Sequence, residues 1–227
     1  MRNLREGSVG SDVMELQSTL RKLGLYREAP NGEFESGTEQ AVRNFQSWRG
    51  AAADGVVGPQ TWKILKPFLL GFDNYFIQPG DTFYTIGKKY GASPTLIAAA
   101  NPDLKPEHLM PGIRITVPYS YDVVTTDADY TYEVLRRNIE GLKARYPSLM
   151  VGMIGRSVLG RSLYALRLGV GENRVAYNAA HHALEWITAP VLMKFAEDSL
   201  KARAMNQPLD GYDMQKLWDG SSVWLVP

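Results

Sequence analysis

Apolar residues recur every three or four positions in three stretches near the start of the chain. That spacing predicts helices over about 13–23, from Thr38 to about 46, and from Pro59 to about 65. Thr38 is suited to N-capping, and proline is tolerated in a first helical turn. We therefore expect an all-α segment with three helices, followed by a short connection over 66–74.

A different pattern occupies residues 75–118. Residues 76–77 can form a short strand, and residues 113–117 alternate like a half-buried strand. Between them, apolar positions indicate one helix around 86–90 and another around 96–100. The expected order is strand, helix, helix, strand.

Helical and strand patterns alternate in the remainder of the chain. The elements expected there are a helix over 132–146, strands over 151–154, 162–168, 175–178 and 223–227, and a helix over 189–204. No internal repeat is evident, so each of the three segments counts as a separate module present once.

Composition limits the partners of this 227-residue chain. Its 25 basic and 24 acidic residues nearly cancel, which gives no electrostatic reason to expect a nucleic acid or an anionic membrane. A neutral glycan remains possible. The chain has no cysteine, which excludes disulfides, thiolate metal sites and a cysteine nucleophile.

The N-terminus lacks the apolar segment of a secretory signal, and no stretch approaches the roughly 20 apolar residues of a membrane helix. We therefore expect cytoplasmic synthesis with an unknown route of release, unless the natural start lies upstream.

A series of landmarks runs in order through residues 1–68. They are Gly7-x-x-Gly10, Val13-x-x-Leu16-Gln17-x-x-Leu20, Leu23-Gly24-x-Tyr26, Gly32-x-Phe34, Thr38-x-x-Ala41-Val42-x-x-Phe45-Gln46 and Asp54-Gly55-Val56-Val57-Gly58-Pro59-x-Thr61-Trp62. The segment resembles the three-helix peptidoglycan-binding domain. Its apolar landmarks are expected to form the core, and binding is expected from exposed loop residues that the sequence does not single out.

Residues 75–118 carry a second series of landmarks. They are Gly80-Asp81-Thr82, Ile86-x-x-x-Tyr90-Gly91, Leu96-Ile97-x-x-x-Asn101-Pro102 and Leu109-x-x-Gly112-x-x-Ile115-x-Val117-Pro118. They resemble the βααβ LysM domain, which implies that two loops bind glycans containing N-acetylglucosamine. The residues expected to bind glycan are Gly80, Asp81, Thr82, Asn101 and Pro102. Helix capping is the expected main role of Asp81 and Thr82, with sugar contacts coming largely from neighbouring backbone.

His182 and Glu185 form the one metal-ligand pattern in the sequence. A spacing of three can place an imidazole nitrogen and a carboxylate oxygen around one ion, and zinc accepts that ligand mix. The bare pattern is weak, because a helical His and Glu at this spacing often merely pair on the surface.

The surroundings of this pattern resemble the zinc carboxypeptidase family over residues 121–227. The matching features are Tyr146-Pro147, Ile154-Gly155-x-Ser157-x-x-Gly160-Arg161 and His182-x-x-Glu185-Trp186-Ile187. The resemblance implies an α/β fold around a mixed sheet, with His182 and Glu185 as ligands of Zn²⁺. Leu184 stands where the family often has an arginine that helps to bind substrate, so recognition of a free C-terminal carboxylate is put in doubt.

The family's third ligand, a downstream His, and its general base, a downstream Glu, have no counterpart here. His108 belongs to the LysM-like segment, and His181 is adjacent to His182, so their side chains tend to diverge. No catalytic residue is therefore expected in this chain. Because the sequence stops inside an expected core strand, we expect an incomplete peptidase domain and an inactive chain.

The three modules together resemble bacterial γ-D-glutamyl-L-diamino acid endopeptidases, which cleave the stem peptides of peptidoglycan. The resemblance implies peptidoglycan and N-acetylglucosamine glycans as partners, and a location at the cell wall or spore. One alternative is a non-catalytic wall-binding protein with a degenerate peptidase scaffold. Another is a muramidase or amidase with the same binding modules, although the His182-x-x-Glu185-Trp186 context argues against it.

Overall fold

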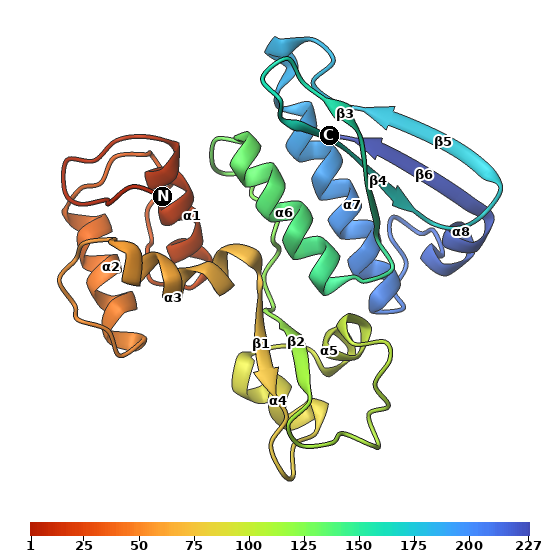
Figure 1. The fold of residues 1–227 in the computed structure, drawn as a ribbon, viewed down its shortest axis with the longest axis horizontal. Helices are drawn as coiled ribbons and strands as arrows, with labels where there is room; N and C mark the ends of the chain where they lie inside the picture. The colour runs from red at the N-terminus through yellow and green to blue at the C-terminus, as the bar shows by residue number, and fades with distance from the viewer. The chain divides into compact units, whose positions relative to one another are not determined.

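The computed structural model describes residues 1–227, except for the side chain of Ala183. The chain divides into two compact units (Figure 1). The first comprises residues 1–70 together with 125–132, and the second comprises residues 71–124 together with 133–227. Each unit is described by itself.

Three helices build the first unit, as the apolar spacing predicted. They are α1 (Ser11–Lys22), α2 (Ser36–Trp48) and α3 (Pro59–Leu70). Helix α2 begins two residues before Thr38, and α3 continues through residues 66–70, where a connection was expected. The buried apolar residues include Val13, Leu16, Leu20, Phe34, Val42, Phe45, Trp62 and Leu65.

A buried glutamine on α1 organises the first loop of this unit. The Gln17 amide nitrogen donates to the Glu33 carbonyl and the Thr38 hydroxyl, each at 2.9 Å. The Gln17 amide oxygen accepts the backbone N–H groups of Asn31 at 3.0 Å and Gly32 at 2.9 Å. One side chain thereby satisfies polar groups that burial would otherwise penalise.

A second buried glutamine does the same for the next loop. The Gln46 amide nitrogen donates to Asp54 Oδ1 at 2.8 Å, to the Val56 carbonyl at 3.0 Å and to the Thr61 hydroxyl at 3.0 Å. The Gln46 amide oxygen accepts the N–H of Gly55 at 2.9 Å.

The two glutamine networks have the same sequence pattern. In each, an Asn-Gly or Asp-Gly turn is followed by a threonine seven residues after its first member, as in Asn31 to Thr38 and Asp54 to Thr61. This short polar motif therefore occurs twice within the first module, while the apolar residues around it differ in identity.

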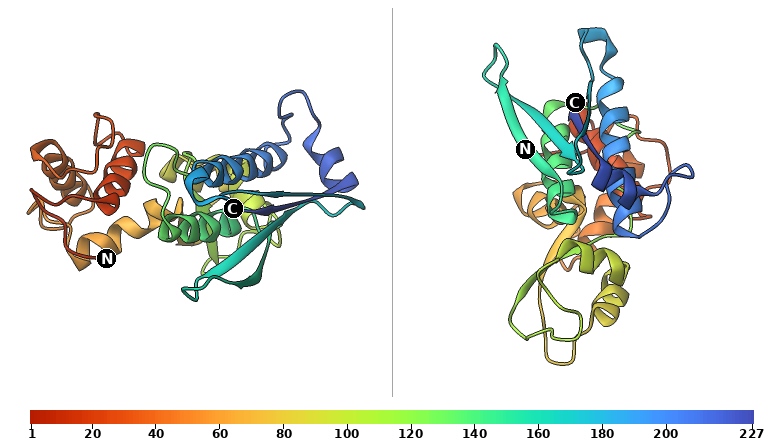
Figure 2. Two further views of the ribbon diagram at one scale, coloured as in Figure 1. Left: turned by 90° about the horizontal axis from the view of Figure 1, so that it is seen from above. Right: turned by 90° about the vertical axis from the view of Figure 1, so that its right-hand side faces the viewer.

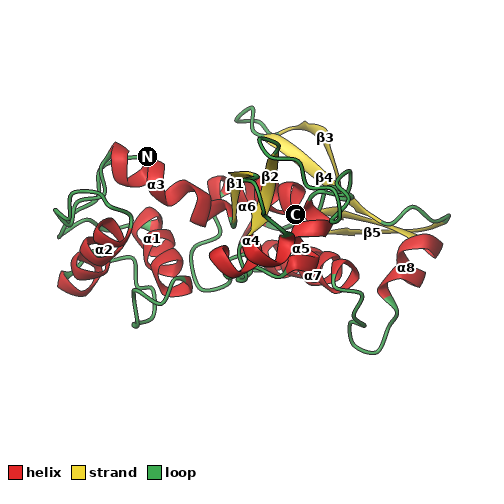
Figure 3. Ribbon diagram, turned by 90° about the horizontal axis from the view of Figure 1, so that it is seen from below, coloured by secondary structure: helices red, strands yellow, loops and turns green.

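The second unit begins with the expected strand, helix, helix, strand order. The elements are β1 (Phe72–Phe76), α4 (Phe83–Tyr90), α5 (Pro94–Ala100) and β2 (Arg114–Pro118). Strands β1 and β2 pair antiparallel as a two-stranded sheet (Figure 3). Strand β1 starts before the predicted 76–77, because its register pairs Phe72 with Pro118. The buried core is Ile77, Phe83, Ile86, Ala92, Ile97, Ile115 and Val117.

The rest of the second unit is an α/β fold with a mixed sheet. Its elements are α6 (Tyr132–Arg145), β3 (Met150–Arg156), β4 (Ser162–Leu168), β5 (Asn173–Asn178), α7 (Thr188–Ala204), α8 (Met214–Gly220) and β6 (Ser221–Val226). The sheet order is β3-β4-β6-β5, antiparallel except for the parallel pair β5–β6. Helix α8 was not predicted.

The two faces of this sheet differ. Helix α7 lies along one face (Figure 2), where Phe195 lines a hollow together with Val175 and Val223. On the opposite face, register aligns Met150, Arg167 and Trp224 in one row across β3, β4 and β6. Met150 and Trp224 are exposed there, with the Arg167 guanidinium 5.7 Å from the Trp224 ring centre.

A buried carboxylate ties the segment after β2 to α7. Both oxygens of Glu197 accept backbone N–H groups, from Val123 at 2.7 Å and Val124 at 2.9 Å. Arg145 of α6 is also fully buried and donates to the Tyr121 carbonyl at 2.8 Å. Burial raises the pKa of Glu197, while the charge of Arg145 and the two backbone donors oppose that rise.

An ion-paired carboxylate reinforces the same attachment. Asp122 lies 3.0 Å from the ammonium of Lys194 and 2.7 Å from that of Lys201. Burial by itself would raise the pKa of Asp122, but the hydrogen bonds and charges of the two lysines outweigh burial and lower that pKa. Residues 121–124 are therefore held by side chains of α6 and α7.

Among the helices described, none is long and apolar enough to cross a bilayer.

Candidate metal and glycan sites

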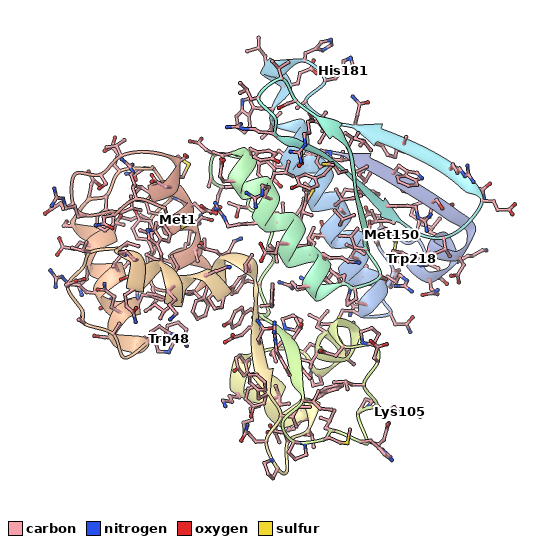
Figure 4. All side chains as sticks on the ribbon, in the orientation of Figure 1. Met1, Trp48, Lys105, Met150, His181 and Trp218 are labelled. Atoms are coloured by element: carbon pink, nitrogen blue, oxygen red, sulfur yellow. The ribbon has the colours of Figure 1, made fainter. Side chains whose placement is uncertain are left out.

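The His182–Glu185 pattern lies in a turn between β5 and α7. The turn contains a short 3₁₀ helix, Ala183–Glu185, in place of the longer helix that a His-x-x-Glu pattern favours. Its start is fixed to the sheet, because the N–H of Ala179 donates to the Val226 carbonyl at 2.9 Å. His181, labelled in Figure 4, marks this turn beyond the end of the sheet.

The turn brings the two predicted ligands together. His182 Nδ1 lies 3.0 Å from Glu185 Oε1, and the side chains are 75% and 53% exposed. The donor or acceptor role of Nδ1 in this contact depends on the imidazole tautomer. The second carboxylate oxygen of Glu185 accepts the His182 N–H at 3.4 Å, so the same side chain also bonds the backbone at the start of the 3₁₀ helix.

This arrangement fits two ligands of one zinc ion. Imidazole nitrogen and carboxylate oxygen bind zinc at about 2.0–2.2 Å, so two such ligands lie about 3.0–3.5 Å apart at angles between 90° and tetrahedral. The His182–Glu185 separation of 3.0 Å lies in that range. Among the described side chains, no group of three or more His, Asp or Glu could hold a metal. The turn thus contributes two candidate zinc ligands, His182 and Glu185.

His181 is engaged elsewhere in the turn. Its Nδ1 lies 3.2 Å from the amide nitrogen of Asn178, and its ring is nearly perpendicular to that of His182. The two imidazoles lie close together, with ring centres 5.2 Å apart in an edge-to-face arrangement, so the side chains do not diverge as the sequence led us to expect.

The first predicted glycan loop is stabilised by internal hydrogen bonds. Thr82 is the N-cap of α4 and forms a capping box with Thr85. Asp81 does not cap the helix; its carboxylate accepts the Gln78 N–H at 2.7 Å and the Tyr75 hydroxyl at 2.8 Å. That hydrogen bond to Asp81 is the main cause that raises the pKa of Tyr75 to about 12. Asp81 therefore orients the loop, whose Gly80 has a φ of 84°.

The second predicted glycan loop begins at Asn101, whose side chain bridges α5 and β2. Its amide nitrogen donates to the carbonyls of Ile97 and Thr116, both at 2.7 Å, and its oxygen accepts the Thr116 N–H at 2.9 Å. These bonds consume both amide donors, so the side chain mainly supports the loop. Glycan contact by Pro102 and by the loop backbone stays a prediction.

Thr188 directly follows the Glu185-Trp186-Ile187 run, and the structure places its hydroxyl against the turn. Its hydroxyl contacts the backbone at both Ala180 and Glu185, on either side of His182. The available signal in the sequence was a threonine three residues after Glu185, the predicted ligand. Spacing alone does not show that its hydroxyl turns back toward the preceding loop.

Family models match three successive segments of the chain. Residues 9–65 match a peptidoglycan binding domain, residues 75–118 a LysM domain, and residues 135–227 a zinc carboxypeptidase. The chain carries two glycan-binding module types and a zinc carboxypeptidase domain. The predicted fold class is confirmed: a multidomain chain with an all-α module, a βααβ module and an α/β peptidase-type module with a mixed sheet.

Curated relatives that match part of this chain include an endopeptidase and a spore cortex-lytic enzyme. Gamma-D-glutamyl-L-diamino acid endopeptidase 1 of Lysinibacillus sphaericus is 33% identical over 108 residues, which is 48% of this chain and 27% of that protein. The spore cortex-lytic enzyme of Halalkalibacterium halodurans is 36% identical over 97 residues, which is 41% of this chain and 28% of that protein. The chain therefore spans about a quarter of the length of these curated relatives.

Among solved structures, the SleB N-terminal domain is 41% identical, with a TM-score of 0.28. The match covers 28% of this chain and 88% of that one.

Proposed function

We propose that this chain belongs to a cell-wall hydrolase that binds peptidoglycan through its first two modules and cleaves stem peptides with its zinc carboxypeptidase domain. The bond proposed is of the γ-D-glutamyl-diaminopimelate type. The observation that carries the proposal is the convergence of His182 and Glu185 at 3.0 Å within the zinc carboxypeptidase match. The name of the Lysinibacillus sphaericus relative supports the choice of bond.

His182 and Glu185 would hold the zinc ion, through imidazole nitrogen and carboxylate oxygen. A bound zinc polarises a carbonyl and lowers the pKa of a coordinated water. The exposed turn leaves room for a substrate to approach, since both side chains are more than half exposed. Catalytic zinc sites usually have three protein ligands. With two donors in this chain, we expect no hydrolysis by the 227 residues alone.

The proposed binding function places the glycan at the two LysM loops, around Gly80–Thr82 and Asn101–Pro102. Because Asp81, Thr82 and Asn101 are engaged in internal hydrogen bonds, they present the loop backbone to the acetamido groups. The first module would add a second weak contact on the same polymer. Two linked weak sites gain avidity on a repetitive substrate.

The wall-binding part of the proposal is tested by co-sedimentation of the whole chain with insoluble peptidoglycan. We expect the chain in the pellet at both low and high salt, because the near-neutral charge gives little for salt to screen. A chain that stays in the supernatant under both conditions would contradict wall binding. A chain released by salt would show that charge, and not glycan recognition, holds it.

The catalytic part is tested with muropeptides that contain γ-D-glutamyl-diaminopimelate, with added zinc, followed by mass spectrometry. We expect no cleavage by this chain. Zinc-dependent cleavage that disappears in His182→Ala or Glu185→Gln would show that the site is completed in a way that two ligands do not explain.

The alternative, a wall-binding protein with a degenerate peptidase scaffold, also predicts no cleavage. Zinc binding separates the two functions, because a degenerate scaffold has no reason to retain a zinc site at His182 and Glu185.

A further inference from the structure

We propose that Thr188 is a positioning residue for the turn over residues 179–187, which we call the metal turn. Its hydroxyl fixes the backbone of this turn so that the side chains of His182 and Glu185 can bind the same ion. The inference rests on the proposed zinc site and adds a residue to it. It starts from two short hydrogen bonds that meet on one hydroxyl.

The first bond reaches back across the turn. The backbone N–H of Ala180 donates to Thr188 Oγ1 at 2.7 Å. Ala180 has a φ of 49°, in the left-handed region that costs a non-glycine residue about 1–2 kcal/mol. A residue keeps such a conformation only where its surroundings hold it, and the bond to Thr188 supplies that hold.

The second bond closes the other end. The same hydroxyl donates to the Glu185 carbonyl at 2.7 Å. Thr188 is the first residue of α7, so its backbone is anchored in a 17-residue helix. His182 lies between the two bonded positions, Ala180 and Glu185, and Glu185 is the other proposed ligand. The hydroxyl therefore spans the residues whose spacing decides whether the two donors converge.

Other contacts of the turn leave this span open. The Ala179–Val226 bond fixes the end nearest the sheet, and the Glu185 N–H donates to the His182 carbonyl inside the 3₁₀ turn. The contacts between His182 and Glu185 stay within the 3₁₀ helix, whereas those of Thr188 extend across the turn from Ala180 to Glu185. Outer residues that orient metal ligands typically change metal affinity by about 10–100-fold when replaced.

The test compares three versions of the full chain: wild type, Thr188→Val and Thr188→Ser. Valine keeps the branched shape and loses the hydroxyl, whereas serine keeps the hydroxyl. Zinc affinity is measured by isothermal titration, and hydrogen exchange of the Ala180 amide is measured in the zinc-free chain. Thermal unfolding of each variant shows whether the fold is unchanged.

We expect valine to weaken zinc binding about 10-fold and to speed exchange of the Ala180 amide, with serine close to wild type in both. Unchanged zinc affinity in Thr188→Val would overturn the inference, and so would a serine variant as weak as the valine variant. A wild-type chain that binds no zinc would contradict the proposed zinc site instead. In that case slow Ala180 exchange in wild type and serine, and fast exchange in valine, would still establish that the Thr188 hydroxyl fixes the turn.

Discussion

The glutamine networks of the first unit and the metal turn of the second both hold a loop between regular elements, the first with buried side chains and the second with exposed ones. Gln17 and Gln46 are buried and each bonds several backbone groups of its loop. His182 and Glu185 are exposed and are held by bonds within a short turn.

This difference in burial separates the residues that stabilise the fold from those proposed to bind the ion. Buried polar networks are costly to break, because each group left unpaired loses its bond without gaining water. The exposed side chains of His182 and Glu185 contribute little to stability, so exchanging their mutual contact for the proposed zinc ion would cost little. We therefore expect substitution of Gln17 or Gln46 to lower the free energy of unfolding, and substitution of His182 or Glu185 to weaken zinc binding.

The largest loss of stability is expected for Gln17→Ala and Gln46→Ala. Each leaves at least one loop N–H buried without its acceptor, and each should cost about 3 kcal/mol or more in the first unit. Native-state hydrogen exchange of α1 and α2 amides measures the loss. Gln40→Ala, at a less buried position on α2, is the matched control, with about 0.5 kcal/mol or less expected. Unequal losses at the two glutamines would break the equivalence of the repeated pattern.

A smaller loss is expected for Glu197→Gln. The glutamine amide can accept one of the two backbone N–H groups but presents its own N–H to the other, so we expect about 2–3 kcal/mol. Glu140→Gln, an exposed change on α6, should have little effect. Chemical denaturation of the second unit, with exchange of the Val123 and Val124 amides as the local probe, provides the measurement. A Glu197→Gln chain as stable as wild type would show that the buried carboxylate does not hold this segment.

Asp122→Asn should cost less, about 1 kcal/mol or below, since the ion pairs with Lys194 and Lys201 are partly exposed. The folded state lowers the pKa of Asp122, so its stabilising contribution is complete above the unfolded pKa, near 4, and is lost as pH falls through the folded value. The difference in unfolding free energy between wild type and variant should therefore be constant from pH 6 to 8 and shrink well below pH 4. If the difference in unfolding free energy between wild type and variant grows as the pH falls, the lowered pKa of Asp122 in the folded state is contradicted.

The sequence predicted helices well where apolar side chains repeat, as in α1 and in α6, because burial of one helix face decides both. It missed α8, which has no buried residue, so no apolar stripe marks it. It placed β1 too late, since the register with β2, and not the local pattern, selects Phe72 as the first paired residue.

At the candidate site, the sequence identified His182 and Glu185 but not what holds them. Spacing and family resemblance are enough to propose a ligand pair, whereas the bonds of Thr188 depend on how the turn folds back. Asp81 shows the same limit: its place beside Thr82 suggested a helix cap, and the fold uses its carboxylate to bond Tyr75 and Gln78.

The most direct test of the account is zinc titration of the chain and of three variants. We predict one zinc per chain in wild type, weakly held because two ligands are fewer than a catalytic site usually has. His182→Ala and Glu185→Gln should lose that zinc with changes in unfolding free energy of about 0.5 kcal/mol or less, while His181→Ala retains it. A wild-type chain that takes up no zinc, or variants at His182 and Glu185 that bind it as wild type does, would contradict a zinc site in this turn.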